Sequence, residues 1–180
     1  MSNPCGGGFA VLEPNEAAVA LIMQQLGTGM QQFQGRLKVQ KCLYLLEQMG
    51  VDLGFRFNWY IRGPYCPALA DIGFHIEQDA GQGSGAEALN EWTLQGTVQE
   101  KLDALKLVVD AAPQPLTTER WAELLASLHF LAQLPTLQGR GRDDVEADLL
   151  RRKPYLASSQ AAFPNAWERL ACLALKVPES

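Results

Sequence analysis

Apolar side chains recur at intervals of one, three and four residues in two segments near the start of the chain, a spacing that collects them on one face of a helix. After a flexible lead-in over residues 1–13, the first segment runs from Pro14 to about Leu26, before Gly27. The second runs from Gly35 to Gly50 and is apolar over much of its circumference. We therefore expect the second helix in the centre of the core.

A two-residue repeat replaces the helical spacing after Gly54. It predicts a half-buried strand with apolar side chains inward (Phe55, Phe57, Trp59, Ile61) and polar ones outward (Arg56, Asn58, Tyr60, Arg62). Gly63-Pro64 predicts a turn, and Pro67 begins a helix that reaches about Gln78. Since a lone strand leaves its backbone groups unpaired, a second strand is expected from the residues just before it or from Trp92–Leu94.

Helical spacing returns in the second half of the chain. Residues 79–90 are rich in Gly, Ala and Ser and predict a flexible loop between an N-terminal half (14–78) and a C-terminal half (91–180). Helices are expected over residues 97–111, from Thr117 or Thr118 to Leu134, over 143–152, and from an Asn165 cap to about Lys176 with Trp167, Leu170 and Leu173 inward. The sequence thus predicts one domain of the mainly α (α+β) class, with six or seven helices and one small β-hairpin that carries the W-Y-x-x-G-P-Y turn.

Composition narrows the possible functions. The chain has 180 residues and a formal net charge of -5, which argues against a nucleic-acid binder dominated by overall charge but leaves room for a local basic patch. No stretch approaches the length of a membrane span, and no secretory signal is visible. The four scattered cysteines (Cys5, Cys42, Cys66, Cys172) fit reduced thiols better than a disulfide or zinc framework. A cytoplasmic protein without a membrane-spanning helix is expected.

Catalytic motifs are missing from the sequence. No phosphate loop, nucleophile elbow or metal-binding helix is found, and the glycines at 6–8 lack the lysine and hydroxyl residue of a phosphate loop. His75 and His129 are the two histidines, and each is expected to be structural or exposed, because a catalytic histidine needs a nucleophile or a substrate acid close by. The alternative is a histidine–carboxylate site of His75 with Asp71 or Asp79, four residues away on either side. We therefore expect no catalytic residue, no metal and no cofactor.

Two basic clusters are the candidates for binding. Arg36, Lys38 and Lys41 lie in the first turns of the central helix, where cations oppose the helix dipole. Arg56 and Arg62 lie with Tyr60 on the polar face of the strand, beside Tyr65. If helix and strand pack together, these groups form a surface for an anion or an acidic partner. The alternative is a solvated rim with ion pairs to Glu47, Asp52 or Asp71, and the mixed charges at 140–153 predict a solvated helix face.

The helix and the turn also carry a family resemblance. The segments 37–46 (LKVQKCLYLL) and 57–70 (FNWYIRGPYCPALA) resemble the L-Q-K-x-x-Y-L-L helix and W-Y-x-x-G-P-Y-S-P-x-L-A turn of the YwgA-like family, and also the Panacea or SocA-like domain. Weaker similarity continues at 124–131, 152–155 and 166–170. The chain departs from the pattern at Cys66, where a serine is commoner. Five residues belong to this motif: Gln40, Tyr44, Trp59, Gly63 and Pro64. Their alternative to a role in function is a purely architectural one.

The resemblance implies a function in binding another protein. The Panacea or SocA-like domain is associated with antitoxins and a proteolytic adaptor near phage and mobile-element genes. It implies a non-enzymatic interaction module that binds a protein partner, with Lys38, Lys41, Arg56, Tyr60, Arg62 and Tyr65 as candidate binding residues. The alternative is a nucleic-acid or nucleotide-binding subunit of a larger defence complex, and an enzyme with a cryptic site near His75 or Tyr65 is a third hypothesis. The oligomeric state does not follow from the sequence.

Overall fold

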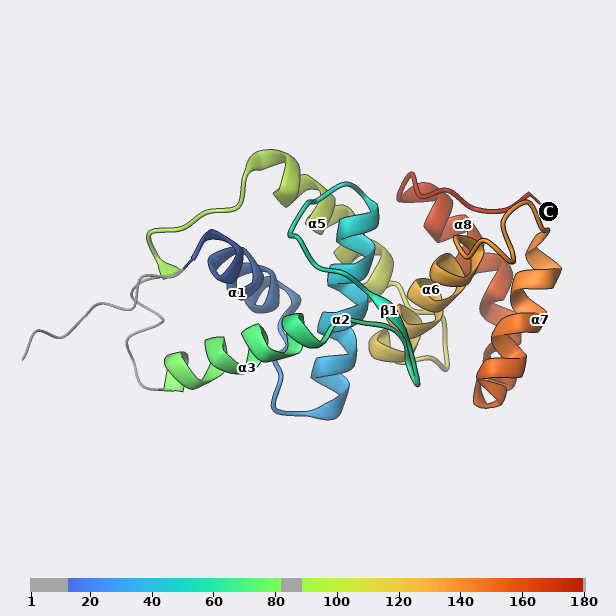
Figure 1. Cartoon of the computed structure of the whole chain (residues 1–180), viewed down its shortest axis with the longest axis horizontal. Helices are drawn as coiled ribbons and strands as arrows, with labels where there is room; N and C mark the ends of the chain where they lie inside the picture. The colour runs from blue at the N-terminus through green and yellow to red at the C-terminus, as the bar shows by residue number, and fades with distance from the viewer. Residues whose placement is uncertain (1–12, 82–88, 180) are drawn as a thin grey trace, which may run out of the picture.

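The computed structural model describes residues 13–81 and 89–179 (Figure 1). In these residues seven α-helices and one two-stranded hairpin form the fold, as the sequence predicted. The elements are α1 (Pro14–Leu26), α2 (Phe33–Gln48), β1 (Asn58–Tyr60), β2 (Gly63–Tyr65), α3 (Pro67–Gly81), α5 (Gly96–Asp110), α6 (Thr118–Ala132), α7 (Arg142–Arg152), the 3₁₀ helix η1 (Pro154–Ala162) and α8 (Phe163–Cys172). No helix among the described residues has the length and apolarity to cross a membrane.

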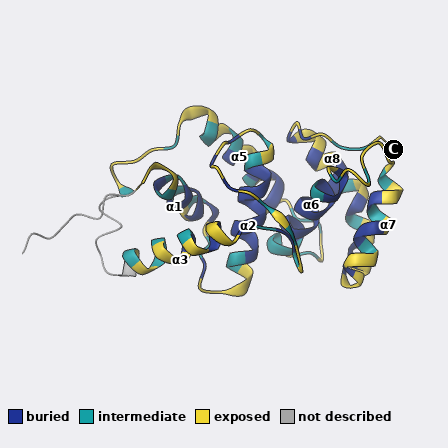
Figure 2. Ribbon diagram, viewed as in Figure 1, coloured by how far each residue is buried: buried dark blue, intermediate teal, exposed yellow. Residues whose placement is uncertain are grey.

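The pair α2 and α6 forms the centre of the molecule. α2 packs against α6, α5, α3 and the hairpin, and α6 packs in turn against α7 and α8. Figure 1 shows the consequence: α1 and α3 lie at one end, α7 and α8 at the other, with α2 and α6 between them. The buried residues concentrate on these two central helices, and every residue of α2 from Leu37 to Leu46 is buried (Figure 2). The expectation that this helix lies in the core is confirmed.

The hairpin differs from its predicted form. The strand β1 spans Asn58–Tyr60 rather than eight residues, and its partner is the Gly63–Tyr65 segment that the sequence suggested was only a turn. Tyr60 pairs with Gly63, so Ile61 and Arg62 form the connection. The alternation of burial therefore stops at Tyr60, and Ile61, predicted to point inward, is 70% exposed. Neither the residues before the strand nor Trp92–Leu94 pair with it.

Several helix ends also differ from expectation. α3 continues to Gly81, so the first residues of the expected 79–90 loop are helical, while residues 82–88 of that loop and the expected lead-in over 1–12 lie outside the described residues. The last helix begins at Phe163 with Pro164 in its first turn, so Asn165 lies inside it and is not its cap. It ends at Cys172, because Ala174 takes a left-handed conformation with φ 56°. Thr117 does cap α6, accepting a hydrogen bond from the backbone N–H of Arg120.

Candidate binding site

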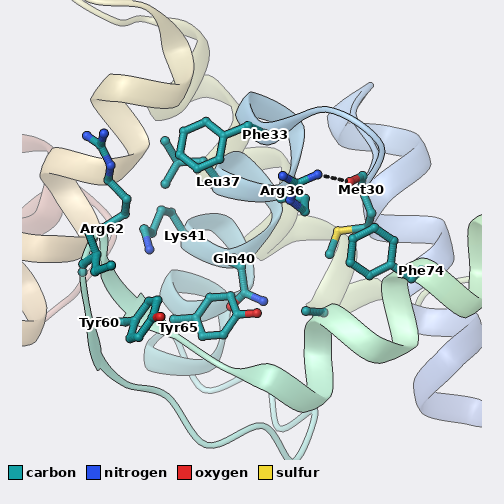
Figure 3. Close-up of a pocket in the computed structure, with 13 residues that line it drawn as sticks. Met30, Phe33, Arg36, Leu37, Gln40, Lys41, Tyr60, Arg62, Tyr65 and Phe74 are labelled. Atoms are coloured by element: carbon teal, nitrogen blue, oxygen red, sulfur yellow. Dashed lines mark hydrogen bonds between the residues drawn. The ribbon is translucent and has the colours of Figure 1, made fainter.

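A cavity of about 360 Å³ opens between α2, the hairpin and α3 (Figure 3). One face of α2 supplies Phe33, Arg36, Leu37, Gln40 and Lys41, whose spacing of three, four, seven and eight residues places them on the same side of a helix. The hairpin supplies Tyr60, Ile61, Arg62, Gly63 and Tyr65. Met30 and two residues of α3, Ala70 and Phe74, complete the lining. The volume is at the lower end of the range of small-ligand sites, so it suits a small molecule or one or two side chains of a partner.

Two side chains of α2 hold the second strand in place. Gln40 is buried and makes two hydrogen bonds with the backbone of Cys66: its Nε2 donates to the carbonyl oxygen at 2.9 Å, and its Oε1 accepts from the N–H at 2.8 Å. The Nζ of Lys41 donates to the carbonyl oxygen of Pro64 at 2.6 Å. Gln40 thus makes contacts of the kind that its alternative, architectural role requires. These contacts fix the wall of the cavity relative to its helical floor.

The lining is positively charged. It contains Arg36, Lys41 and Arg62, and among its described residues there is no aspartate or glutamate. Arg36 donates from one Nη to the carbonyl oxygens of Met30 and Gln31, at 2.9 and 3.1 Å. The guanidinium of Arg62 lies 4.5 Å from the centre of the Tyr155 ring, a cation–π geometry. Burial, with Lys153 nearby as a second cation, lowers the pKa of Lys41 to about 7, although the charge of Glu123 opposes the shift.

The rest of the lining is mostly apolar and aromatic. Phe33 and Phe74 flank Arg36, with ring centres 6.0 and 5.9 Å from its guanidinium carbon. The rings of Tyr60 and Tyr65 lie 5.5 Å apart on the hairpin side, and Figure 3 shows Lys41 between this pair and Phe33. Cations set among exposed aromatic edges and faces can hold a group that is both anionic and apolar.

A buried polar cluster lies next to the hairpin, and the sequence did not predict it. Glu123 of α6 is fully buried and accepts hydrogen bonds from Lys153 (3.0 Å), Tyr155 (2.5 Å) and Arg120 (2.7 Å). Lys153 also donates to the hydroxyl of Ser127 at 2.9 Å and lies 5.1 Å from the Trp59 ring centre. Burial lowers the pKa of Lys153 to about 8, with Glu123 opposing the shift. Lys153 is thus buried although the mixed charges around it predicted a solvated face.

The predicted binding residues divide into two groups. Lys41, Tyr60, Arg62 and Tyr65 line the cavity together. Lys38 is turned away from it: its Nζ donates to the carbonyl oxygen of Leu26 and lies 3.9 Å from Asp110. Arg56 is exposed and does not line the cavity. The alternative prediction was a solvated rim in which these arginines form ion pairs with Glu47, Asp52 or Asp71. Among the described residues, neither Arg56 nor Arg62 forms such an ion pair.

The remaining motif residues have structural positions. The hydroxyl of Tyr44 and Nδ1 of His129 are hydrogen-bonded at 2.8 Å in the core, where burial lowers the pKa of His129 to about 4. His75 is exposed. Trp59 is half-buried beside Phe130 and Lys153. Gly63 and Pro64 form the start of β2, beneath which Ser127 and Lys153 pack.

The two phenylalanines of the site were not predicted from the sequence. Phe33 and Phe74 line the cavity and contact Arg36, yet both are partly exposed aromatic residues with no motif around them. Phe33 precedes Leu37 and Gln40 by four and seven residues, so extending the helix two residues before Gly35 would have placed it on the site face. Phe74 comes from a third element, and only the fold brings it there.

The thiols and the hydroxyl–amine pair of the described chain lie outside the cavity lining. The described part of the chain contains no group of three or more His, Cys, Asp or Glu side chains placed to hold a metal ion. Cys42, Cys66 and Cys172 are free thiols, and the first two are buried. Ser127 and Lys153 are a hydroxyl–amine pair of the kind that some hydrolases use, but both are fully buried and neither lines the cavity.

Comparison with known protein families, with curated proteins and with solved structures finds no match. The resemblance to the YwgA-like family and to the Panacea or SocA-like domain therefore rests on the motifs of the sequence. What the resemblance implies about function stays a proposal.

Proposed function

We propose that this protein is a non-enzymatic interaction module, antitoxin-like or adaptor-like, of a mobile-element or phage-defence system, and that it binds a protein partner at the cavity between α2 and the hairpin. The single observation that carries this proposal is the composition of the cavity: three cations without a carboxylate, surrounded by aromatic and aliphatic side chains. Such a lining matches the aromatic and arginine-rich character of protein-binding hot spots. The resemblance stated above supplies the biological setting.

The chain's overall charge supports a local electrostatic role for this surface. The protein has a formal net charge of -5, whereas the cavity lining carries three basic residues and no carboxylate among its described residues. The lining therefore distinguishes one surface from the rest of the molecule, which favours a defined docking orientation.

A tagged pull-down from the native host at physiological salt tests the proposal, with bound protein and nucleic acid both identified. The informative comparison is Arg62→Glu against Arg56→Glu. Both arginines lie near the hairpin, but Arg62 lines the cavity and Arg56 is exposed outside it. A stoichiometric protein partner that is lost with Arg62→Glu and retained with Arg56→Glu supports docking at the cavity. Equal retention by both variants argues that the partner binds elsewhere.

A nucleic-acid or nucleotide-binding subunit is the second candidate function. Cations next to aromatic rings also suit a stacked base and its phosphate, which is the observation in its favour. This alternative expects nuclease-sensitive material in the pull-down, with binding that weakens steeply as salt rises and is lost on charge reversal of Lys41 and Arg62.

A further inference from the structure

The three buried lysines of the described chain have different surroundings. Lys38 lies 3.9 Å from the carboxylate of Asp110, and Lys153 lies 3.0 Å from the carboxylate of Glu123. Lys41 has no carboxylate within 4 Å among the described residues, and its hydrogen bond to Pro64 uses one of the three donors of an ammonium group. A buried ammonium without a counter-ion is costly, so this position favours either a neutral amine or an anion supplied from outside.

Lys41 is open to an anion only through the cavity. Its side chain is 1% exposed, yet it forms part of the cavity lining, and Figure 3 shows it surrounded by Phe33, Gln40 and Arg62. Arg36 and Arg62 line the same space, and neither has an ion-pair partner within 4 Å in the described residues. Three basic residues therefore line one small volume without a described counter-ion, with the guanidinium of Arg62 resting against Tyr155 beside the cavity.

The apolar walls restrict the kind of anion. Phe33, Leu37 and Phe74 offer no hydrogen bonds, so a strongly hydrated dianion such as phosphate would lose water contacts that they cannot replace. A carboxylate attached directly to an apolar group satisfies both parts of the lining. The last residue of a protein chain has this combination, because its free carboxylate adjoins its own side chain.

Given the protein-binding role proposed above, on which this inference rests, we propose that the cavity receives the C-terminal residue of the partner chain. Its carboxylate pairs with Lys41 and Arg62, and its aromatic or branched aliphatic side chain packs against Phe33, Leu37 and Phe74. The cavity volume of about 360 Å³ accommodates one large residue and part of the next. Recognition of a chain end in this way needs only a short segment of the partner.

Proton uptake accompanies this binding. Because the pKa of Lys41 is lowered to about 7 in the free protein, a bound carboxylate raises it again by favouring the ammonium form. Affinity is then constant below pH 7, where Lys41 is already protonated, and falls as the pH rises above 7. The limit of this dependence for a single proton is a tenfold loss of affinity per pH unit.

The test uses blocked hexapeptides of Gly and Ser that end in Phe, prepared as the free acid and as the C-terminal amide, with binding measured by calorimetry on the full chain. We expect the acid to bind at least tenfold more tightly than the amide at pH 6.5. Lys41→Met should abolish the preference for the acid over the amide and the pH dependence of binding. Arg62→Ala should weaken binding of the peptide acid at least fivefold. Arg56→Ala, outside the cavity, should leave both affinities unchanged. Equal binding of acid and amide, or an unchanged preference in Lys41→Met, overturns the proposal.

Two further probes identify the source of the carboxylate. 3-Phenylpropionate carries the same acid and ring without a peptide, and if it binds as tightly as the peptide acid, the site belongs to a small-molecule acid and the chain-end proposal fails. Phenyl phosphate that binds more tightly than 3-phenylpropionate overturns the choice of a carboxylate over a phosphate.

The failure of this inference is distinguishable from failure of the proposed function. A partner recovered in the pull-down that binds Lys41→Met normally, and is not displaced by the peptide acid, keeps the protein-binding role and removes the chain-end proposal. A peptide acid that binds as expected while the native host yields no protein partner keeps the site chemistry and counts against the interaction module.

Discussion

At the scale of single residues, Gly63 is the position where the hairpin can least tolerate a side chain. Its φ is +86°, and a Cβ there would lie 2.5 Å from the Ser127 hydroxyl and 3.1 Å from the Lys153 ammonium. Gly54 has a similar φ of +76°, but the nearest atom to its Cβ position is 3.9 Å away. A substitution at Gly54 therefore introduces backbone strain alone, whereas the same substitution at Gly63 adds a steric clash to that strain.

We expect Gly54→Ala to lower the free energy of unfolding by about 1 kcal/mol, the cost of a left-handed alanine. Gly63→Ala should lower it by roughly 2–4 kcal/mol, because the methyl group also displaces Ser127 and Lys153 from the buried cluster. Urea unfolding of both variants measures the difference. Equal losses would mean that the cluster rearranges freely around the hairpin, so that its geometry is not fixed by Gly63.

Part of the candidate site could be predicted residue by residue from the sequence. Lys41, Tyr60, Arg62 and Tyr65 were predicted as binding residues and do share one cavity. The prediction treated the cations as exposed, whereas Lys41 and Lys38 are buried. Charge in a sequence predicts exposure well on average, but a lysine stem is long enough to reach a carbonyl or carboxylate inside the fold.

At the scale of secondary-structure elements, Gln40 connects α2 to the hairpin. Its two hydrogen bonds satisfy both backbone groups of Cys66, which are buried at the end of β2. Gln40→Leu keeps the size of the side chain but leaves the N–H of Cys66 unpaired, while its carbonyl oxygen keeps the hydrogen bond from the Ala70 N–H at 3.3 Å. Since a buried unpaired backbone group costs about 1–3 kcal/mol, we expect a loss of the same size, roughly 1–3 kcal/mol, in unfolding free energy.

Hydrogen exchange detects this connection directly. The amide of Cys66 should exchange at least tenfold faster in Gln40→Leu than in the wild type, since its acceptor is gone. Gln48→Leu is the matched control, because Gln48 is an exposed residue of the same helix. Slow exchange of the Cys66 amide in Gln40→Leu would show that packing alone holds the hairpin on α2.

The elements themselves were predictable where their periodicity is strong. α1, α2, α5 and α6 follow the apolar spacing to within about two residues of their ends, because the buried stripe and the cap are local signals. The hairpin was less predictable. Its second strand, Gly63–Tyr65, contains a glycine and a proline that normally mark a turn, and its stability depends on Gln40, Lys41 and Ser127 from other elements.

At the scale of the whole molecule, the cavity exists because three elements meet. Phe33 and Arg36 come from α2, Arg62 from the hairpin and Phe74 from α3. No local pattern records that these residues face one volume, which is why the aromatic part of the lining was missed. The buried cluster also depends on packing between elements. Glu123 and Lys153 are thirty residues apart and meet because α6 packs against α7, after which Lys153 follows directly.

The buried bases of this molecule make its stability depend on pH in one direction. Lys41 has a pKa of about 7 in the folded protein against 10.5 ordinarily, and Lys153 about 8 against 10.5. The pKa of His129 is about 4 in the folded protein, against an ordinary value of 6.5. In each window the unfolded chain binds more protons than the folded protein, so the free energy of unfolding rises with pH. The two lysines make the free energy of unfolding depend on pH above pH 7, and His129 does so between pH 4 and 6.5.

Lys41→Met tests the upper window. The variant removes a buried ammonium without a described counter-ion, but it also removes the hydrogen bond that the Pro64 carbonyl accepts. At pH 7 it should therefore be more stable than the wild type by roughly 1–3 kcal/mol. As the pH rises towards 9.5 the wild type should recover most of this difference, because the variant lacks the part of the pH dependence that Lys41 contributes. Chemical unfolding between pH 6 and 9.5 measures both slopes, and Lys176→Met, at an exposed lysine, should follow the wild type. If the stability difference between Lys41→Met and the wild type does not change between pH 6 and 9.5, the ammonium of Lys41 is satisfied within the fold, and the cavity has no unpaired charge to offer a ligand.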